Sequence, residues 1–112
     1  MTVREAIIHP KALEVLRGFS KDARKAFEEA IRELQLGRSL SMPLSRPMPS
    51  VALGVSELRI QDRHDTCRVF YSVKSSRGIF VFHAFKKKTR KTPKDEIELA
   101  RKRLKEMLNE TR

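Results

Sequence analysis

Two arginines on neighbouring predicted strands are the residues in this sequence whose types and spacing best suit chemistry. Arg59 and Arg68 occupy alternating positions on strands 55–60 and 67–74, which a short polar loop joins into a hairpin. A guanidinium group grips a phosphate through two parallel hydrogen bonds, so two such groups on one hairpin could clamp a single phosphate. The alternative is that both arginines are exposed on the sheet and pair with Glu57 or with an acid of the loop.

A cluster of positive charge follows the predicted strand 79–85. Six of the nine positions from Lys86 to Lys94 are Lys or Arg, and none is acidic. Like charges repel one another into solvent, so a solvated turn is one interpretation. Because this connector is held between a buried strand and a helix, the other interpretation is a surface that displays its charges together to phosphates.

His83 is the one polar residue in strand 79–85. A lone histidine in a strand is more often a hydrogen-bonded structural residue than a catalyst. It also lies three residues before the lysine cluster, and the pKa range of imidazole suits proton transfer. The other histidines, His9 and His64, do not combine with Cys67 into the spacing of a metal site, so no metal and no other cofactor is expected.

The charge balance indicates an anionic partner. The 112 residues include 25 Lys and Arg against 14 Asp and Glu, which gives a net charge of +11. The excess is +3 in residues 1–54 and +8 in residues 55–112. A basic half on a small domain points to a polyanion, most often nucleic acid, and an acidic protein partner would give the same pattern.

The length predicts one domain, residues 1–112. The single cysteine, Cys67, excludes an intrachain disulfide and is expected to be buried, as is Tyr71. The sequence has no apolar run that approaches a membrane span and no export signal, so a cytoplasmic protein without a membrane partner is expected.

The elements that must position these residues follow from the apolar pattern. We expect a short strand in 3–8, a helix in 11–17 and a longer helix between an N-cap at Ser20 and a C-cap at Gly37. The proline-containing stretch 38–54 is predicted to be a surface connection, attached to the core by Leu40, Leu44 and Leu53.

Three strands joined by short turns then make an antiparallel meander. A final helix is expected to begin with Thr92 as N-cap and Pro93 at the first helical position, and its apolar stripe includes Ala100 and Leu108. The predicted fold class is α+β, with two N-terminal helices packed on a small twisted antiparallel sheet and a C-terminal helix.

Three segments carry a resemblance to a known family. SELRI, RVFY and HAFKKKTRKTPKDEIELARKRL, in this order and with these gaps, resemble the RelE/ParE superfamily of bacterial toxins, and most closely its phage-derived HigB-like branch. The resemblance extends from the helical hairpin to Leu108. It implies a RelE-like fold and a metal-independent endoribonuclease, an mRNA interferase, that cuts messenger RNA on the ribosome. It also implies a cognate helix-turn-helix antitoxin, with a homodimer or a toxin–antitoxin heterotetramer as the assemblies left open.

The resemblance also implies which residues form the site. Arg59 matches the arginine of ELR, Arg68 that of RVFY, and His83 and Phe85 the HAF segment. The expected reaction is attack of a ribose 2′-hydroxyl on the adjacent phosphate, with Arg68 and Arg59 as the phosphate clamp, His83 as the base and a connector lysine as the acid. The predicted catalytic residues are Arg59, Arg68, His83 and Lys88, and the predicted RNA-binding residues are Lys86, Lys87, Arg90 and Lys91.

Three functions remain open on the sequence. The first is the ribosome-dependent endoribonuclease toxin. The second is a ParE-like inhibitor of DNA gyrase, although members of that branch generally lack the basic connector seen here. The third is a non-catalytic basic domain that binds nucleic acid or an acidic partner, because fold does not imply function.

Overall fold

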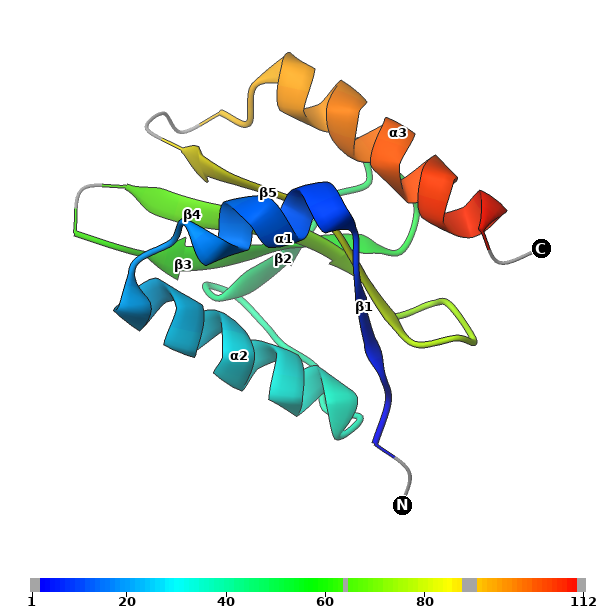
Figure 1. The fold of residues 1–112 in the computed structure, drawn as a ribbon, viewed down its shortest axis with the longest axis horizontal. Coiled ribbons are helices and arrows are strands. Elements are labelled where there is room, and N and C mark those ends of the chain that lie inside the picture. The colour runs from blue at the N-terminus through cyan, green and yellow to red at the C-terminus, as the bar shows by residue number, and fades with distance from the viewer. Residues whose placement is uncertain (1–2, 64, 88–90, 111–112) are drawn as a thin grey trace.

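A five-stranded sheet forms the centre of the computed structural model, which describes residues 3–63, 65–87 and 91–110 (Figure 1). The strands run in the order β1-β5-β4-β3-β2 across the sheet. They are β1 (Ala6–Ile8), β2 (Ser45–Pro47), β3 (Val55–Gln61), β4 (Thr66–Ser72) and β5 (Ile79–Lys87). The helices are α1 (Pro10–Arg17), α2 (Lys21–Gln35) and α3 (Lys94–Asn109).

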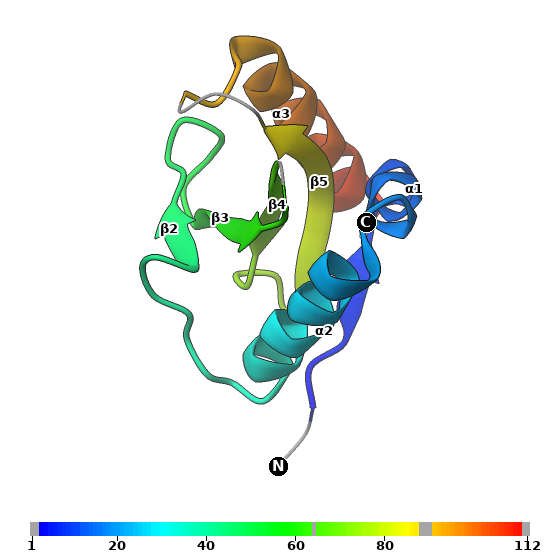
Figure 2. The same ribbon diagram turned by 90° about the vertical axis from the view of Figure 1, so that its left-hand side faces the viewer.

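The helices divide between the two faces of the sheet (Figure 2). Helices α1 and α2 pack through residues such as Leu16 and Phe27 against Val69 and other apolar side chains on one face. Helix α3 packs through Ala100 and Met107 against a phenylalanine-rich cluster on the opposite face. The structure therefore confirms the α+β class, and each face of the sheet has its own apolar core.

The sheet is mixed, whereas the sequence predicted an antiparallel one. Strands β3, β4 and β5 do form the expected antiparallel meander. The first strand lies beside β5 and runs parallel to it, with Ala6 opposite Ile79. A parallel pair needs a crossover connection, and the chain between β1 and β5 is long enough to supply one.

The expected surface connection 38–54 contains a strand. Strand β2 pairs antiparallel with the start of β3, with Arg46 opposite Glu57. Leu44 and Leu53 were expected to attach this stretch to the core, but both are exposed, and Met48 and Val51 are the buried residues instead. A three-residue strand that ends in proline has too few positions to show a period of two, which is why the apolar pattern did not indicate it.

The helix ends bear out some predicted caps and correct others. Ser20 caps α2, since its Oγ accepts a hydrogen bond from the backbone N–H of Ala23 at 3.0 Å, and Gly37 follows the helix with a φ of 85°. Helix α3 begins at Lys94 with Pro93 at the N-cap position and no side-chain cap, so Thr92 does not have the predicted role. Near its end, Leu108 is half exposed.

No helix within the described ranges is both long enough and apolar enough to cross a membrane. Cys67 and Tyr71 are buried, as predicted. The hydroxyl of Tyr71 shares a hydrogen bond of 2.5 Å with Ser45 Oγ, which links β4 to β2 through a polar contact inside the core.

Candidate functional site

The two arginines point to the face of the sheet that carries α3. Arg59 on β3 lies directly opposite Arg68 on β4 in the antiparallel register. Side chains alternate between the faces of a strand, so Arg68 shares its face with Phe70, which belongs to the core beneath α3. The predicted common face of Arg59 and Arg68 is confirmed.

Arg68 is buried in an ion pair, whereas the alternative drawn from the sequence placed such a pair on the exposed surface of the sheet. Its Nη1 donates a hydrogen bond to Glu57 Oε1 at 2.8 Å, and the exposed fractions of Arg68 and Glu57 are 4% and 0%. The pairing with Glu57 that the sequence left open as an alternative is therefore present, but inside the protein. A buried ion pair lacks hydration, and removing one partner leaves an uncompensated charge.

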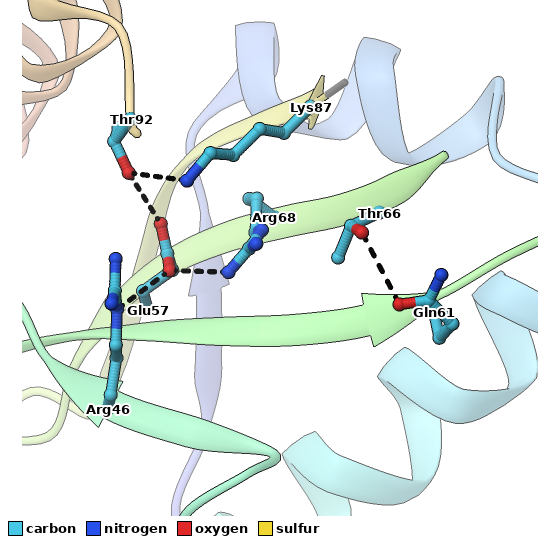
Figure 3. A network of polar contacts seen from close by, with 7 residues as sticks. All are labelled: Arg46, Glu57, Gln61, Thr66, Arg68, Lys87 and Thr92. Carbon is cyan, nitrogen blue, oxygen red and sulfur yellow. Dashed lines mark hydrogen bonds and ion pairs between the residues drawn. The ribbon is translucent and has the colours of Figure 1, made fainter. Parts of the chain in front are cut away.

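Glu57 also contacts two residues from other elements (Figure 3). Arg46 on β2 places its Nε 3.2 Å from Glu57 Oε1, at an angle that makes the contact an ion pair rather than a hydrogen bond. Thr92, just before α3, donates its hydroxyl hydrogen to Glu57 Oε2 at 3.2 Å. Glu57 thus joins β2, β4 and the start of α3 at one carboxylate.

Lys87, at the end of β5, completes this group. It lies opposite Thr66 in the register, on the same face as Arg68, and it is 4% exposed. Its ammonium group donates a hydrogen bond to Thr92 Oγ1 at 3.4 Å. We call the six residues that meet here the Glu57 cluster: Arg46, Glu57, Arg59, Arg68, Lys87 and Thr92.

The electrostatics of the Glu57 cluster favour an incoming anion. Four of its side chains are cations and one is an acid. Burial lowers the pKa of Lys87, and the nearby positive charge of Arg68 lowers it further. Burial likewise lowers the pKa of Arg68.

Part of the hydrogen-bonding capacity of the cluster is unused. Within the described part of the chain, the buried Nε of Arg68 has no hydrogen-bond partner. The side chain of Arg59, which is partly exposed, makes no hydrogen bond or ion pair with other described residues. Buried N–H groups are nearly always paired in native proteins, so the unpaired Nε–H of Arg68 is the donor of this cluster that a ligand oxygen could satisfy.

The described lysines of the basic connector, Lys86, Lys87 and Lys91, lie in different surroundings. Lys87 points into the Glu57 cluster, whereas the exposed Lys86 lies opposite Cys67 and points to the other face of the sheet. Lys91 is exposed beside Thr92. Two other predicted residues, Lys88 and Arg90, lie outside the described residues.

His83 belongs to a separate set of contacts beneath α3. Its Nε2 lies 2.8 Å from Glu96 Oε1, its Nδ1 accepts a hydrogen bond from Arg103 Nη1 at 2.8 Å, and its exposed fraction is 2%. Burial lowers its pKa, although the hydrogen bond to Glu96 opposes this. His83 therefore has the structural environment that the sequence left open, and we assign it no proton-transfer role.

Sequence reasoning missed Arg46 and Thr92 and considered Glu57 only as a surface partner. Glu57 carried a usable signal, since it alternates with Arg59 on the same strand. Arg46 lies in a strand too short to recognise, and Thr92 looked like a helix cap. Their convergence depends on contacts between residues up to 35 positions apart, which no local pattern encodes.

The Glu57 cluster is suited to binding a phosphodiester. Guanidinium and ammonium groups neutralise phosphate oxygens, and a lysine with a lowered pKa releases its proton more readily. Across the described segments, no group of three or more His, Cys, Asp and Glu side chains could hold a metal ion.

The three helices and the five-stranded mixed sheet, with a cation cluster on one sheet face, place the chain among small α+β proteins. The chain belongs to the family described as Phage derived protein Gp49-like (DUF891), whose model matches residues 14–105. This family is one of RelE/HigB-type toxins, which agrees with the resemblance seen in the sequence and implies an antitoxin partner. No curated protein and no solved structure matches the chain.

Proposed function

We propose that this chain is the toxin of a type II toxin–antitoxin system and that it cleaves messenger RNA bound to the ribosome. The observation that carries the proposal is the buried Arg68–Glu57 pair, with Lys87 and Arg59 on the same sheet face. Membership of the Gp49-like family supports the toxin class. The cognate antitoxin is proposed to be a small helix-turn-helix protein.

The proposed reaction is attack of a ribose 2′-hydroxyl on the neighbouring phosphorus, which leaves a 2′,3′-cyclic phosphate and a free 5′-hydroxyl. Arg68 donates its unused N–H to a phosphate oxygen, and Arg59 adds a second cation as charge develops on the phosphorane. Glu57 holds the guanidinium of Arg68 in place before the substrate binds, so little reorganisation of this group is needed at the moment of reaction.

Lys87 is proposed as the general acid. Its ammonium group protonates the departing 5′-oxygen, and the proton of the attacking 2′-hydroxyl passes to water. The lowered pKa of Lys87 brings it closer to the operating pH, where proton transfer is most effective. Glu57 already accepts from Arg68 and Thr92, so its role is to hold these donors in place.

The test is cleavage of a translated message by purified protein in a reconstituted translation reaction, read by primer extension. Lys87→Met removes the ammonium group and keeps an apolar stem in a buried position, so we expect cleavage to fall by about 10²- to 10⁴-fold. Lys74→Met, on an exposed lysine just beyond β4, is the matched control and should cut like the wild type.

The wild-type protein should leave the same message largely intact when ribosomes are omitted. Equal activity of Lys87→Met and wild type would remove Lys87 from the reaction. Growth arrest by the wild type without any cut message would contradict the endoribonuclease and favour the gyrase-inhibitor alternative.

A further inference from the structure

An open groove of about 840 Å³ lies beside the Glu57 cluster, between the segment around β2 and the start of α3. Arg46, Pro47 and Ser50 form one wall, and Thr92, Pro93 and Ile97 form the other.

The groove and the Glu57 cluster share two residues, Arg46 and Thr92. Arg46 from one wall and Thr92 from the other both contact the carboxylate of Glu57 (Figure 3). Arg68 and Lys87 approach the same point from β4 and β5. A phosphate bound by the cluster would therefore have its attached nucleoside at the mouth of the groove.

The residues that line the groove combine positive charge with apolar surface. Arg46, Lys91 and Lys94 are cations, and none of the described residues that line the groove is acidic. Pro47, Pro93 and Ile97 supply apolar surface on both walls. A positively charged groove that follows the backbone is one feature that proteins use to bind single-stranded nucleic acid, and the apolar side chains of this groove offer a surface that a base can contact.

One wall of the groove is held in place by α3. Arg101 Nε donates hydrogen bonds to the backbone carbonyls of Ser50 at 3.0 Å and of Val51 at 3.3 Å. Met48 and Val51 are buried in the core under α3. Because these contacts do not depend on a ligand, the groove is formed before anything binds to it.

We propose that this groove binds one nucleotide of single-stranded RNA that flanks the phosphate held by the Glu57 cluster. Single-stranded RNA is the fitting substrate because its bases can leave the stack and enter a protein slot. The inference deepens the proposed function. It rests on that function at one point only, namely that the phosphate held by the Glu57 cluster is the one that is cut.

Crosslinking tests the location of the nucleotide without requiring cleavage. The probe is a single-stranded tetranucleotide that carries 4-thiouridine and 2′-O-methyl riboses, so the attacking hydroxyl is blocked. After irradiation with the wild-type protein, mass spectrometry should locate crosslinks in residues 46–50 and 91–97. Crosslinks confined to α2 or to the outer face of α3 would overturn the proposal, as would labelling no greater than that of an irrelevant basic protein.

A filled groove provides the second test. Ser50→Phe adds a bulky side chain to the wall without changing any charge, and Ser76→Phe adds the same group to an exposed turn between β4 and β5. We expect Ser50→Phe to weaken binding of the tetranucleotide about tenfold by fluorescence anisotropy, with Ser76→Phe unchanged. Thermal unfolding of both variants establishes whether either substitution alters the fold.

The outcomes separate this inference from the proposed function. If the wild type cuts ribosomal messages while Ser50→Phe binds and cuts normally, the groove inference fails and the endoribonuclease stands. If crosslinks map to the groove but no message is cut, the groove stands and the endoribonuclease fails. If Ser50→Phe blocks an acidic antitoxin segment and leaves RNA binding intact, the groove is a protein site and the proposal is overturned.

Discussion

At the scale of single residues, Glu57 organises the site, because its carboxylate is the one negative charge in a cluster that also contains four cations. Without it, Arg68 and Arg46 would repel each other in a region from which water is largely excluded. With it, one guanidinium is fixed at 2.8 Å and still keeps an N–H without a partner among the described residues. Arg68 therefore contributes to stability and is also the donor proposed to bind phosphate, so a substitution there must be tested for both.

Arg68→Ala should destabilise the fold as well as stop cleavage. The substitution leaves the fully buried carboxylate of Glu57 without its closest cation, which typically costs about 3–5 kcal/mol of the free energy of unfolding. Urea unfolding at neutral pH measures this loss. Arg59→Ala is the comparison, since Arg59 is partly exposed and has no ion pair with the described residues, and it should cost less than about 1 kcal/mol.

Adding Glu57→Gln to Arg68→Ala should recover part of the lost stability, because the uncompensated negative charge is then removed. Equal losses of unfolding free energy in Arg59→Ala and Arg68→Ala would show that the buried ion pair adds no stability beyond that of an exposed arginine.

The alternation of the sequence predicted that these arginines share a face. It could not predict their different burial, because that depends on Glu57 and on the segment at Thr92.

At the scale of secondary-structure elements, the buried His83 of β5 attaches helix α3 to the sheet. Because Nδ1 of His83 accepts a hydrogen bond from Arg103, the ring proton is on Nε2, which donates to Glu96. The imidazole is therefore neutral, and a second proton would face the guanidinium of Arg103. This set of contacts links β5 to the helix whose first residues form one wall of the groove.

The stability of the protein should fall as the pH drops below about 6.5, the ordinary pKa of histidine. Burial lowers the pKa of folded His83, so the unfolded chain binds more protons in this range and is favoured on acidification. One such group changes the free energy of unfolding by at most about 1.4 kcal/mol per pH unit. Chemical denaturation at pH 7.5 and 5.5 measures the change.

His83→Gln keeps a donor and an acceptor but cannot titrate, so its stability should change less between these two pH values. His9→Asn is the control. It preserves an N-cap for α1 and removes a different histidine that contacts α3 through Glu106. If His9→Asn, rather than His83→Gln, makes the free energy of unfolding less dependent on pH, then His83 is not the group whose titration causes that dependence.

The sequence predicted the long elements better than the short ones. Helix α2 and the three-strand meander each repeat apolar residues often enough to indicate their period. Strand β2 and the start of α3 are too short to show such a repeat. At the start of α3, Thr92 followed by Pro93 resembles a helix start, but the hydroxyl of Thr92 binds Glu57 instead of capping the helix. Tertiary contact overrides the local capping preference at this position.

At the scale of the whole molecule, positive charge is concentrated where the site lies. The half of the chain from residue 55 carries +8 of the +11 net charge, and it contributes the cations of β3, β4, β5 and the start of α3. Helices α1 and α2 pack on the opposite face, and the exposed side of α2 mixes both signs. An RNA chain should therefore meet the protein from the α3 side.

Salt dependence distinguishes this localised charge from a general attraction by net charge. Lys91→Ala with Lys94→Ala removes two cations at the groove, and Lys21→Ala with Lys25→Ala removes two from α2. For single-stranded RNA, each phosphate that the protein no longer neutralises should reduce the slope of log affinity against log salt by about 0.7. The groove pair should therefore flatten the slope of tetranucleotide binding by about 1.4, and the α2 pair should leave it nearly unchanged. Equal flattening by both pairs would mean that RNA binds to the overall charge of the molecule and not to this face.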